Sequence, residues 1–486
     1  KTGRLHKNIK LTDLLGVDLA EDKETIKEIF AKQPFYWEEW NFSDENNPDK
    51  LDKDGNSIEY NFGIDFSKRD TWAMGIEIGN VNNYTSRRIT LSGWVRFVSV
   101  NFSGVVDFIY VIFSGEADFL NATFSREVIF ENATFSGGAC FGKASFSSAV
   151  SFRSVNLSGE ADFLNATFSR EVIFEHATFS GGADFGYAKF SREVIFEHAT
   201  FSGGADFGYA KFSGRADFSS ATFLGAAYFK SVKFLEGASF LSVPFSEGAS
   251  FWSAIFSGRA DFSSATFSEG AFFWSAKFSD ITDFDEARFS EVADFSYVIF
   301  SGEVSFETAI FSKMADFGSV TFSGKADFRS VTFSGKADFG SVTFSAEADF
   351  SEASFEDIFS VKEIIFKDKD IENLNINLSG CTVKNKLMFS LNDDNNYGKT
   401  IFNLHNSNIN YFTCDDKELE NIKLYWENPI DGYDKKMDKK SKIERFLHEL
   451  RIMRRILQDL DWGDGADRYY AKIMDIQAKI LSKFNL

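Results

Sequence analysis

The side chains best suited to chemistry are aspartates that recur at intervals of 22 residues or multiples of 22. A chain that completed one turn every 22 residues would place them in two columns on different faces. The first column is Asp162, Asp184, Asp206, Asp294, Asp316 and Asp338, and the second is Asp261, Asp283, Asp327 and Asp349. Neighbouring carboxylates in such a column repel by about 1 kcal/mol in water. The columns predict either an acidic surface that mimics nucleic acid or meets a basic partner, or an outward motif position that Asp simply fills, and we favour the second interpretation.

Two further patterns resemble ligand sites. His176 and His198 also lie 22 residues apart, but no third ligand recurs with them, so no metal site is expected. Residues 52–56, Asp-Lys-Asp-Gly-Asn, resemble part of a calcium loop. The Gly and Glu spacing of an EF-hand is absent there, and a hairpin turn is the better interpretation.

No cluster of residues stands out as catalytic. The sequence contains no nucleophile–base pair, Gly-rich phosphate loop or carboxylate pair that differs from the repeating background. Its three cysteines, Cys140, Cys381 and Cys414, are too few and too scattered for a disulfide framework or a zinc site. The formal net charge of −20 argues against direct nucleic-acid binding. We therefore expect no enzyme, and no catalytic residue, cofactor or metal.

A phenylalanine repeat must position these side chains. Phe accounts for 60 of the 486 residues, and from Phe97 to Phe355 it recurs at spacings that alternate between five and six, with Leu157 as the one replacement. The residue two positions earlier is mostly Ala or Val. Residues two apart share a face of a strand, whereas residues five apart lie on different faces of a helix. The pattern predicts short strands with the small residue and the Phe pointing inward, joined by Ser- and Gly-rich corners.

Longer identities set the size of one turn. Residues 168–189 recur unchanged as 190–211, a shift of 22 that spans four Phe positions. This predicts a four-sided coil of about 22 residues, in which each repeat is stable only when stacked on its copies. The predicted core is built of stacked Phe and includes Phe163, Phe168, Phe174, Phe179, Phe185, Phe190, Phe196 and Phe201.

The motifs Ala-Asp-Phe-Ser at 216–219 and Ala-Thr-Phe-Ser at 177–180 resemble the pentapeptide-repeat superfamily. Repeats of that family centre on an inward Leu or Phe, with a small residue two positions before and Asp or Asn just before. The resemblance implies an all-β solenoid, a right-handed quadrilateral β-helix. The chain departs from a strict five-residue period, because every second corner contains one extra residue, such as Glu171, Gly182, Glu193 and Gly204.

The flanking regions lack the regular repeat. We expect the N-terminal region to be a cap of mixed structure, with a helix at 24–40 and a strand at 58–66, because an open solenoid end exposes strand edges. A separate ligand-binding domain is the alternative for this region. Apolar alternation at 374–378 and 409–411 predicts irregular further coils, and a helical period at 441–484 predicts a C-terminal α-helical hairpin. The four predicted regions are 1–88, the capping region; 89–360, the regular β-helix; 361–430, the irregular coils; and 431–486, the helical cap or docking segment.

Three functional hypotheses follow. The leading one is a non-enzymatic structural or protein–protein interaction module, whose outward residues meet a protein partner and whose C-terminal helices dock or join copies into a homo-oligomer. The first alternative, implied by acidic members of the superfamily, is a DNA-mimic modulator of a topoisomerase. The second is the soluble regulatory region of a membrane channel or transporter, because residues 444–472 are similar to a segment that often follows pentapeptide repeats. A cytoplasmic location is expected, and membrane contact only if the chain continues beyond Leu486.

Overall fold

The computed structural model describes residues 60–62, 77–78, 89–91, 94–364, 373–391, 399–403, 407–413, 422–424 and 474. Contacts divide the chain into two compact units, Lys1–Glu247 and Gly248–Leu486. All described elements are strands, which pair in parallel and form solenoid turns, about 13 in all. The predicted all-β solenoid is therefore confirmed. The helix predicted at 24–40, the turn at 52–56 and, apart from Met474, the helices at 441–484 lie outside the described residues.

One turn of the first unit illustrates the repeat. It consists of β16 (Ala161–Asp162), β17 (Thr167–Phe168), β18 (Val172–Ile173) and β19 (Thr178–Phe179). Each strand pairs with the strand four places later, so that Ala161 lies beside Ala183 and Val172 beside Val194. From β4 (Val95–Arg96) to β51 (Ser354–Phe355), every strand has this two-residue length. Each turn therefore has four strands, and paired residues are 22 apart in the sequence.

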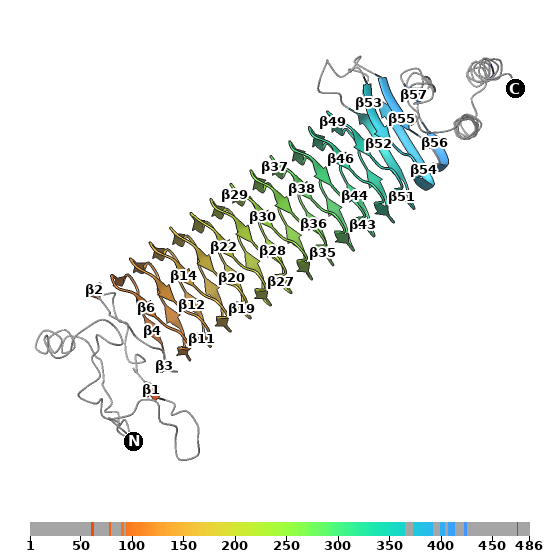
Figure 1. Cartoon of the computed structure of the whole chain (residues 1–486). Helices are drawn as coiled ribbons and strands as arrows, with labels where there is room; N and C mark the ends of the chain where they lie inside the picture. Colours follow the sequence, from red (N-terminus) through yellow and green to blue (C-terminus); the bar gives the residue numbers. More distant parts are fainter. Residues whose placement is uncertain are drawn as a thin grey trace, which may run out of the picture. The chain divides into compact units, whose positions relative to one another are not determined.

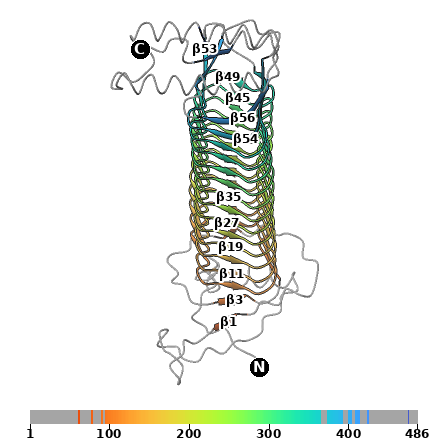
Figure 2. The same ribbon diagram turned by 90° about the vertical axis from the view of Figure 1, so that its right-hand side faces the viewer.

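Successive turns stack directly upon one another within each unit. In the first unit, Figure 1 shows one face formed by β6 (Val106–Asp107), β14 (Val150–Ser151) and β22 (Val194–Ile195). Figure 2 shows another formed by β11 (Thr134–Phe135), β19 and β27 (Thr222–Phe223). On each of these faces, the intervening turns contribute the strands that lie between the labelled ones.

Stacked phenylalanine rings fill the interior. Phe163, Phe185 and Phe207 follow one another in one column, with ring centroids 4.7 and 4.8 Å apart and planes within 1° of parallel. Rings of neighbouring columns meet edge to face, as for Phe174 and Phe185 at 5.5 Å and 85°. All eight predicted core residues named above have 0% exposed surface. The predicted Phe core is thus confirmed, and both ring arrangements are favourable for aromatic side chains.

Two kinds of corner explain why the Phe spacing alternates between five and six. On the five-residue side after Phe163, Asn165 has a φ of 58°, and the N–H of Ala166 donates to the Phe163 carbonyl at 3.0 Å. Such a left-handed residue recurs every eleven positions from Ser99 to Glu352. The six-residue sides contain no such residue and turn through one additional residue, as at Glu171. The extra residue therefore replaces the tight left-handed turn.

Thr308 is the β-branched residue among these left-handed corners, with a φ of 58°. This conformation crowds Cβ against the backbone and is tolerated better by Asn than by Thr. We expect Thr308→Asn to stabilise the second unit by about 1 kcal/mol, measured as an increased denaturant midpoint. Thr321→Asn, on a regular strand, is the control and should give no gain. A lower midpoint for Thr308→Asn would instead show that the bond from the Thr308 hydroxyl to the Glu307 carbonyl, at 2.6 Å, outweighs the strain.

Longer strands follow the regular turns in the second unit. They are β52 (Phe359–Ile364), β53 (Asn373–Asn377), β54 (Thr382–Leu391), β55 (Lys399–Asn403), β56 (Asn408–Thr413) and β57 (Ile422–Leu424). β54 lies between β52 and β56, and β55 between β53 and β57. The alternation predicted at 374–378 lies in β53 except for its last residue, and the one at 409–411 lies in β56. Before the regular turns, the first unit contains β1 (Tyr60–Phe62), β2 (Glu77–Ile78) and β3 (Ile89–Leu91).

Candidate interaction surface

The first predicted aspartate column is present on consecutive turns within each unit. In the first unit, Asp162 pairs with Asp184, and Asp184 with Asp206, on β16, β20 (Ala183–Asp184) and β24 (Ala205–Asp206). In the second unit the members are Asp294, Asp316 and Asp338, on β40 (Ala293–Asp294), β44 (Ala315–Asp316) and β48 (Ala337–Asp338). The strand register thus aligns these carboxylates in rows.

Each carboxylate of this column also caps the following corner. Oδ1 of Asp184 accepts the backbone N–H of Gly186 at 2.7 Å, and Oδ1 of Asp206 accepts that of Gly208 at 2.6 Å. Asp162 makes the same bond at 2.8 Å. Asp294, Asp316 and Asp338 repeat it at 2.9, 2.8 and 3.0 Å. Asp commonly caps turns through a backbone N–H two residues on, so these side chains have a structural task besides any role in binding.

Burial and repulsion from neighbouring carboxylates disfavour ionisation of the central residues of this column, Asp184 and Asp316. Burial raises the pKa of Asp184, and the neighbouring charges of Asp206 and Asp162 add to that increase. Asp316 has a raised pKa for the same reasons, with Asp294 and Asp338 as its neighbours. The bonds from the corner N–H groups act in the opposite direction but do not cancel the increase. The ionised forms of Asp184 and Asp316 therefore cost stability at neutral pH.

The second predicted column lies in the second unit and is interrupted by a serine. Its strands are β34 (Ala260–Asp261), β38 (Thr282–Asp283), β42 (Val304–Ser305), β46 (Ala326–Asp327) and β50 (Ala348–Asp349). Asp261 pairs with Asp283, and Asp327 with Asp349, but Ser305 lies between the two pairs. Asp327 and Asp349 are buried, at 8% and 9% exposure.

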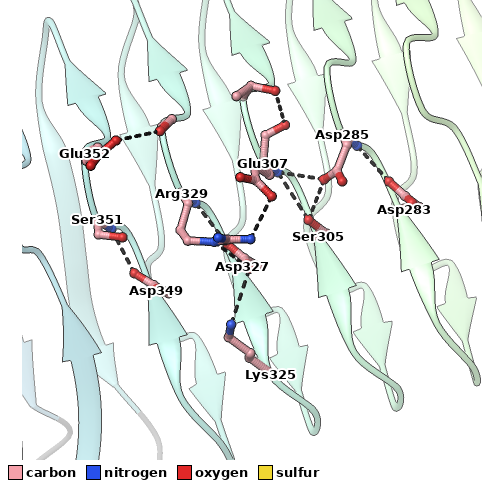
Figure 3. Close-up of polar contacts among 12 residues, drawn as sticks. Asp283, Asp285, Ser305, Glu307, Lys325, Asp327, Arg329, Asp349, Ser351 and Glu352 are labelled. Atoms are coloured by element: carbon pink, nitrogen blue, oxygen red, sulfur yellow. Dashed lines mark hydrogen bonds and ion pairs between the residues drawn. The ribbon is translucent and has the colours of Figure 1, made fainter.

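Basic residues neutralise part of this second column. Arg329 Nε donates to Asp327 at 2.8 Å, and Arg329 Nη2 reaches Glu307 at 2.7 Å, while Lys325 lies 3.3 Å from Asp327 (Figure 3). Burial of Asp327 would raise its pKa, but the hydrogen bonds and charge of Arg329 outweigh it, so the pKa is lowered. Asp285 has a pKa raised chiefly by burial, although Ser305 and the Glu307 N–H donate to it. Asp327 in the second column is therefore compensated by basic residues, whereas the nearby Asp285 is not.

These opposite pKa shifts predict opposite effects of charge removal. Asp184→Asn keeps an oxygen that can accept the Gly186 N–H and removes the repelling charge. We expect it to stabilise the protein by about 0.5–1 kcal/mol at neutral pH. Because the pKa of Asp184 is raised in the folded protein, protonation also relieves the repulsion. The gain should therefore disappear as the pH falls through that raised value.

Asp327→Asn is the matched comparison and should destabilise the protein by about 1–2 kcal/mol, because it breaks the charged contact with Arg329. In the wild-type protein, the lowered pKa of Asp327 means that its carboxylate contributes stability above the ordinary Asp range. This contribution is lost as the pH falls through the folded-state pKa. Denaturant midpoints measured between pH 3 and pH 8 test both variants. The same sign for the two substitutions at neutral pH would contradict the assigned electrostatics.

The remaining predicted ligand residues form no metal site among the described residues. His176 and His198 stack at 5.0 Å with planes within 8° of parallel, and the Nε2 atom of each ring lies 3.6–3.7 Å from the carboxylate of the preceding Glu. No group of three or more potential ligands occurs in the described part of the chain. Cys140 and Cys381 are free thiols, and burial raises the pKa of each to about 12. Cys414 and the 52–56 segment lie outside the described residues.

Sequence reasoning missed a set of exposed aromatic residues. Trp252, Phe272, Trp274 and Tyr297 are exposed in the second unit. In the first unit, Tyr187 and Tyr209 stack at 4.9 Å on the surface. The sequence does contain a pattern that could have predicted them: an aromatic residue replaces Asp, Ser or Gly at some outward motif positions. This pattern is hard to see beside the many inward Phe residues.

Comparison with known proteins identifies the family. A family model described as pentapeptide repeats (9 copies) matches residues 88–134, 130–178, 141–189, 165–211, 207–255, 273–321 and 317–360. These matches cover more than half of the 486 residues, so the chain belongs to the pentapeptide-repeat family. Comparisons with curated proteins and with solved structures gave no match. Within the described residues, no helix is both long and apolar enough to cross a membrane.

Proposed function

We propose that the chain is a non-enzymatic protein–protein interaction module. Its solenoid turns serve as a rigid frame that displays outward side chains in fixed register to a protein partner. The filled interior supports this proposal most directly. Apart from Leu157 and Thr282, the inward positions of the described regular turns hold Phe, Ala or Val, and most of them have almost no exposed surface, as at Phe196 and Ala199. Function must then depend on the outer surface of these turns.

The register of the strands gives this surface its useful property. Each outward position recurs on the next turn at the spacing of adjacent strands, about 4.8 Å. Rows of side chains such as Asp162, Asp184 and Asp206 are therefore held by the backbone pairing. A pre-organised surface loses little conformational freedom when a partner binds. The Asp carboxylates already have a structural role as corner caps. Their presence therefore needs no explanation by nucleic-acid mimicry.

Affinity capture with surface variants tests the proposed function. The intact chain is immobilised, exposed to extract of its source cells, and the retained proteins are identified. Capture is repeated with Asp162→Asn/Asp184→Asn/Asp206→Asn and with Phe272→Ser/Trp274→Ser, both of which leave the Phe core intact. A partner that the wild type retains in a near-stoichiometric amount, and that a surface variant fails to retain, supports the proposal. Failure to retain any stoichiometric partner overturns it.

A further inference from the structure

Four exposed aromatic residues of the second unit form what we call the aromatic patch: Trp252, Phe272, Trp274 and Tyr297. Their exposed fractions are 43%, 42%, 37% and 57%. Each occupies an outward or corner position of the repeat, whereas the core Phe rings beside them, such as Phe273, are fully buried. The patch is therefore an addition to the solenoid surface and not part of its core.

The patch spans three consecutive turns, and three of its four rings lie next to one another. Phe272, on β36 (Ala271–Phe272), lies between Ser250 on β32 (Ala249–Ser250) and Asp294 on β40. The rings of Trp252 and Trp274 lie 5.3 Å apart at 81°, and those of Trp274 and Tyr297 lie 6.0 Å apart at 67°. Contiguous exposed apolar surface of this kind marks interaction sites on soluble proteins.

The fold does not require aromatic residues at these positions. Later turns place Asp316 and Asp338 in the column of Phe272. One glycine, in contrast, accommodates the patch: a Cβ added at Gly270 would lie 2.6 Å from Cζ of the Phe272 ring. The ring thus lies directly against the Gly270 backbone, and a side chain there would displace it. Gly also occupies this corner position at 182, 204 and 248, so Gly270 makes room for the ring but does not by itself indicate a binding site.

The charges around the patch indicate what it can bind. Glu269 and Glu291 are exposed on successive turns at the corner that precedes the Phe272 row, and Asp294 follows Phe272 in that row. Two cations lie on the neighbouring strands: Lys277 on β37 (Lys277–Phe278), after the next corner, and Arg288 on β39 (Arg288–Phe289), before Glu291. Aromatic faces bordered by carboxylates favour a guanidinium, which stacks on the rings and pairs with the acids. The first unit shows such stacking internally, where Arg96 lies 4.9 Å from the ring centroid of Trp94.

We propose that the aromatic patch is a docking site for an arginine-bearing segment of a partner protein. Arginine planes stack on Phe272 and Trp274, their charges face Glu269 and Glu291, and apolar residues of the segment cover the remaining ring surface. Lysine satisfies the charge but lacks the planar group that stacks. This inference rests on the proposed interaction function and specifies the chemistry of the partner.

Peptide binding to the full-length chain tests the proposal. The probe is a fluorescein-labelled nonapeptide of alternating Leu and Arg, and its control carries citrulline, which keeps the shape of Arg without the charge. Fluorescence anisotropy should show binding of the Arg peptide, and binding of the citrulline peptide weaker by about ten-fold or more. Equal binding of the two peptides, or no binding of the Arg peptide, overturns the proposal.

Variants locate the site on the protein. Phe272→Ser/Trp274→Ser should weaken Arg-peptide binding by about ten-fold or more, and Gly270→Ala by about three-fold, because it displaces the ring without removing it. Glu269→Gln/Glu291→Gln should weaken binding and reduce its salt dependence. The matched control is Tyr187→Ser/Tyr209→Ser, which removes exposed aromatics of the first unit and should leave the affinity unchanged. If the control weakens binding as much as the Phe272 and Trp274 variant, the assigned location is wrong.

Two further outcomes separate this inference from the proposed function. If light scattering shows a wild-type dimer that Phe272→Ser/Trp274→Ser dissociates, the patch binds a second copy of the chain and the arginine proposal fails. If the partner captured from extract binds that variant as well as the wild type, the interaction function stands but the patch is not its site. Capture that is lost together with Arg-peptide binding supports both.

Discussion

Replacing Phe196 by Ala is expected to destabilise the first unit by about 3–5 kcal/mol. Phe196 has 0% exposed surface and stacks on Phe174 at 4.7 Å and Phe218 at 4.8 Å. It also meets Phe185 and Phe207 edge to face at 5.5 and 5.6 Å. The substitution therefore removes ring contacts in two directions and leaves a cavity that the hydrogen-bonded turns cannot close. The measurements are the denaturant midpoint and amide hydrogen exchange of the turns on either side.

Two controls separate the loss of the ring from the loss of any side chain. Phe196→Leu should cost less than about 1.5 kcal/mol, because Leu157 already occupies a Phe column with 0% exposure, between Phe135 and Phe179. Phe272→Ala, at an exposed Phe, should cost less than about 1 kcal/mol. A repeat array can unfold in parts, so exchange rates must accompany the midpoint. Similar values for Phe196→Ala and Phe272→Ala would contradict the importance of the ring stack.

The interior could be predicted from the sequence because one physical requirement repeats. Every turn must bury a Phe such as Phe163 and place a small residue such as Ala161 beside it, so the same letters recur wherever the environment recurs. The spacing of the repeat then indicates which residues lie above one another, as Asp162 and Asp184 do. The repeat period is informative here because each inward side chain packs against the same residue type on the next turn.

The outer surface could be predicted only in part, because its contacts depend on the conformation of the corners and on outward residues that differ from turn to turn. The Asp184 bond to the Gly186 N–H depends on the corner conformation, which the spacing alone does not specify. The Asx-turn tendency of Asp was the available signal. The Arg329 contacts to Asp327 and Glu307 depend on side chains of two turns. The aromatic patch replaces residues that the fold does not require, so no rule of the repeat predicts it.

Gly137→Ala is expected to destabilise the first unit by about 2–3 kcal/mol, in the range of an overpacked site. A Cβ at Gly137 would lie 2.7 Å from the carbonyl carbon and oxygen of Gly115 and 2.8 Å from the nitrogen of Glu116. All three are backbone atoms fixed by the stacking of adjacent turns, so no side chain can move aside. Either the two corners must separate or the substituted corner must change its path, and both disturb hydrogen bonds between turns.

The neighbouring glycine provides the control, because a Cβ at Gly138 would meet only the Glu160 oxygen, at 3.7 Å. Gly138→Ala should therefore leave the denaturant midpoint nearly unchanged. Both glycines have negative or extended φ angles, so the comparison isolates space from backbone conformation. Equal effects of the two substitutions would show that the corners separate easily. Arg170 and Arg192 occupy the equivalent corner position on another edge, so this position can carry a side chain where the backbone path of the corner allows it. The expected cost at Gly137 arises from a single Cβ placed within a run that includes Gly115 and Gly159, and it tests whether adjacent turns must share one corner path.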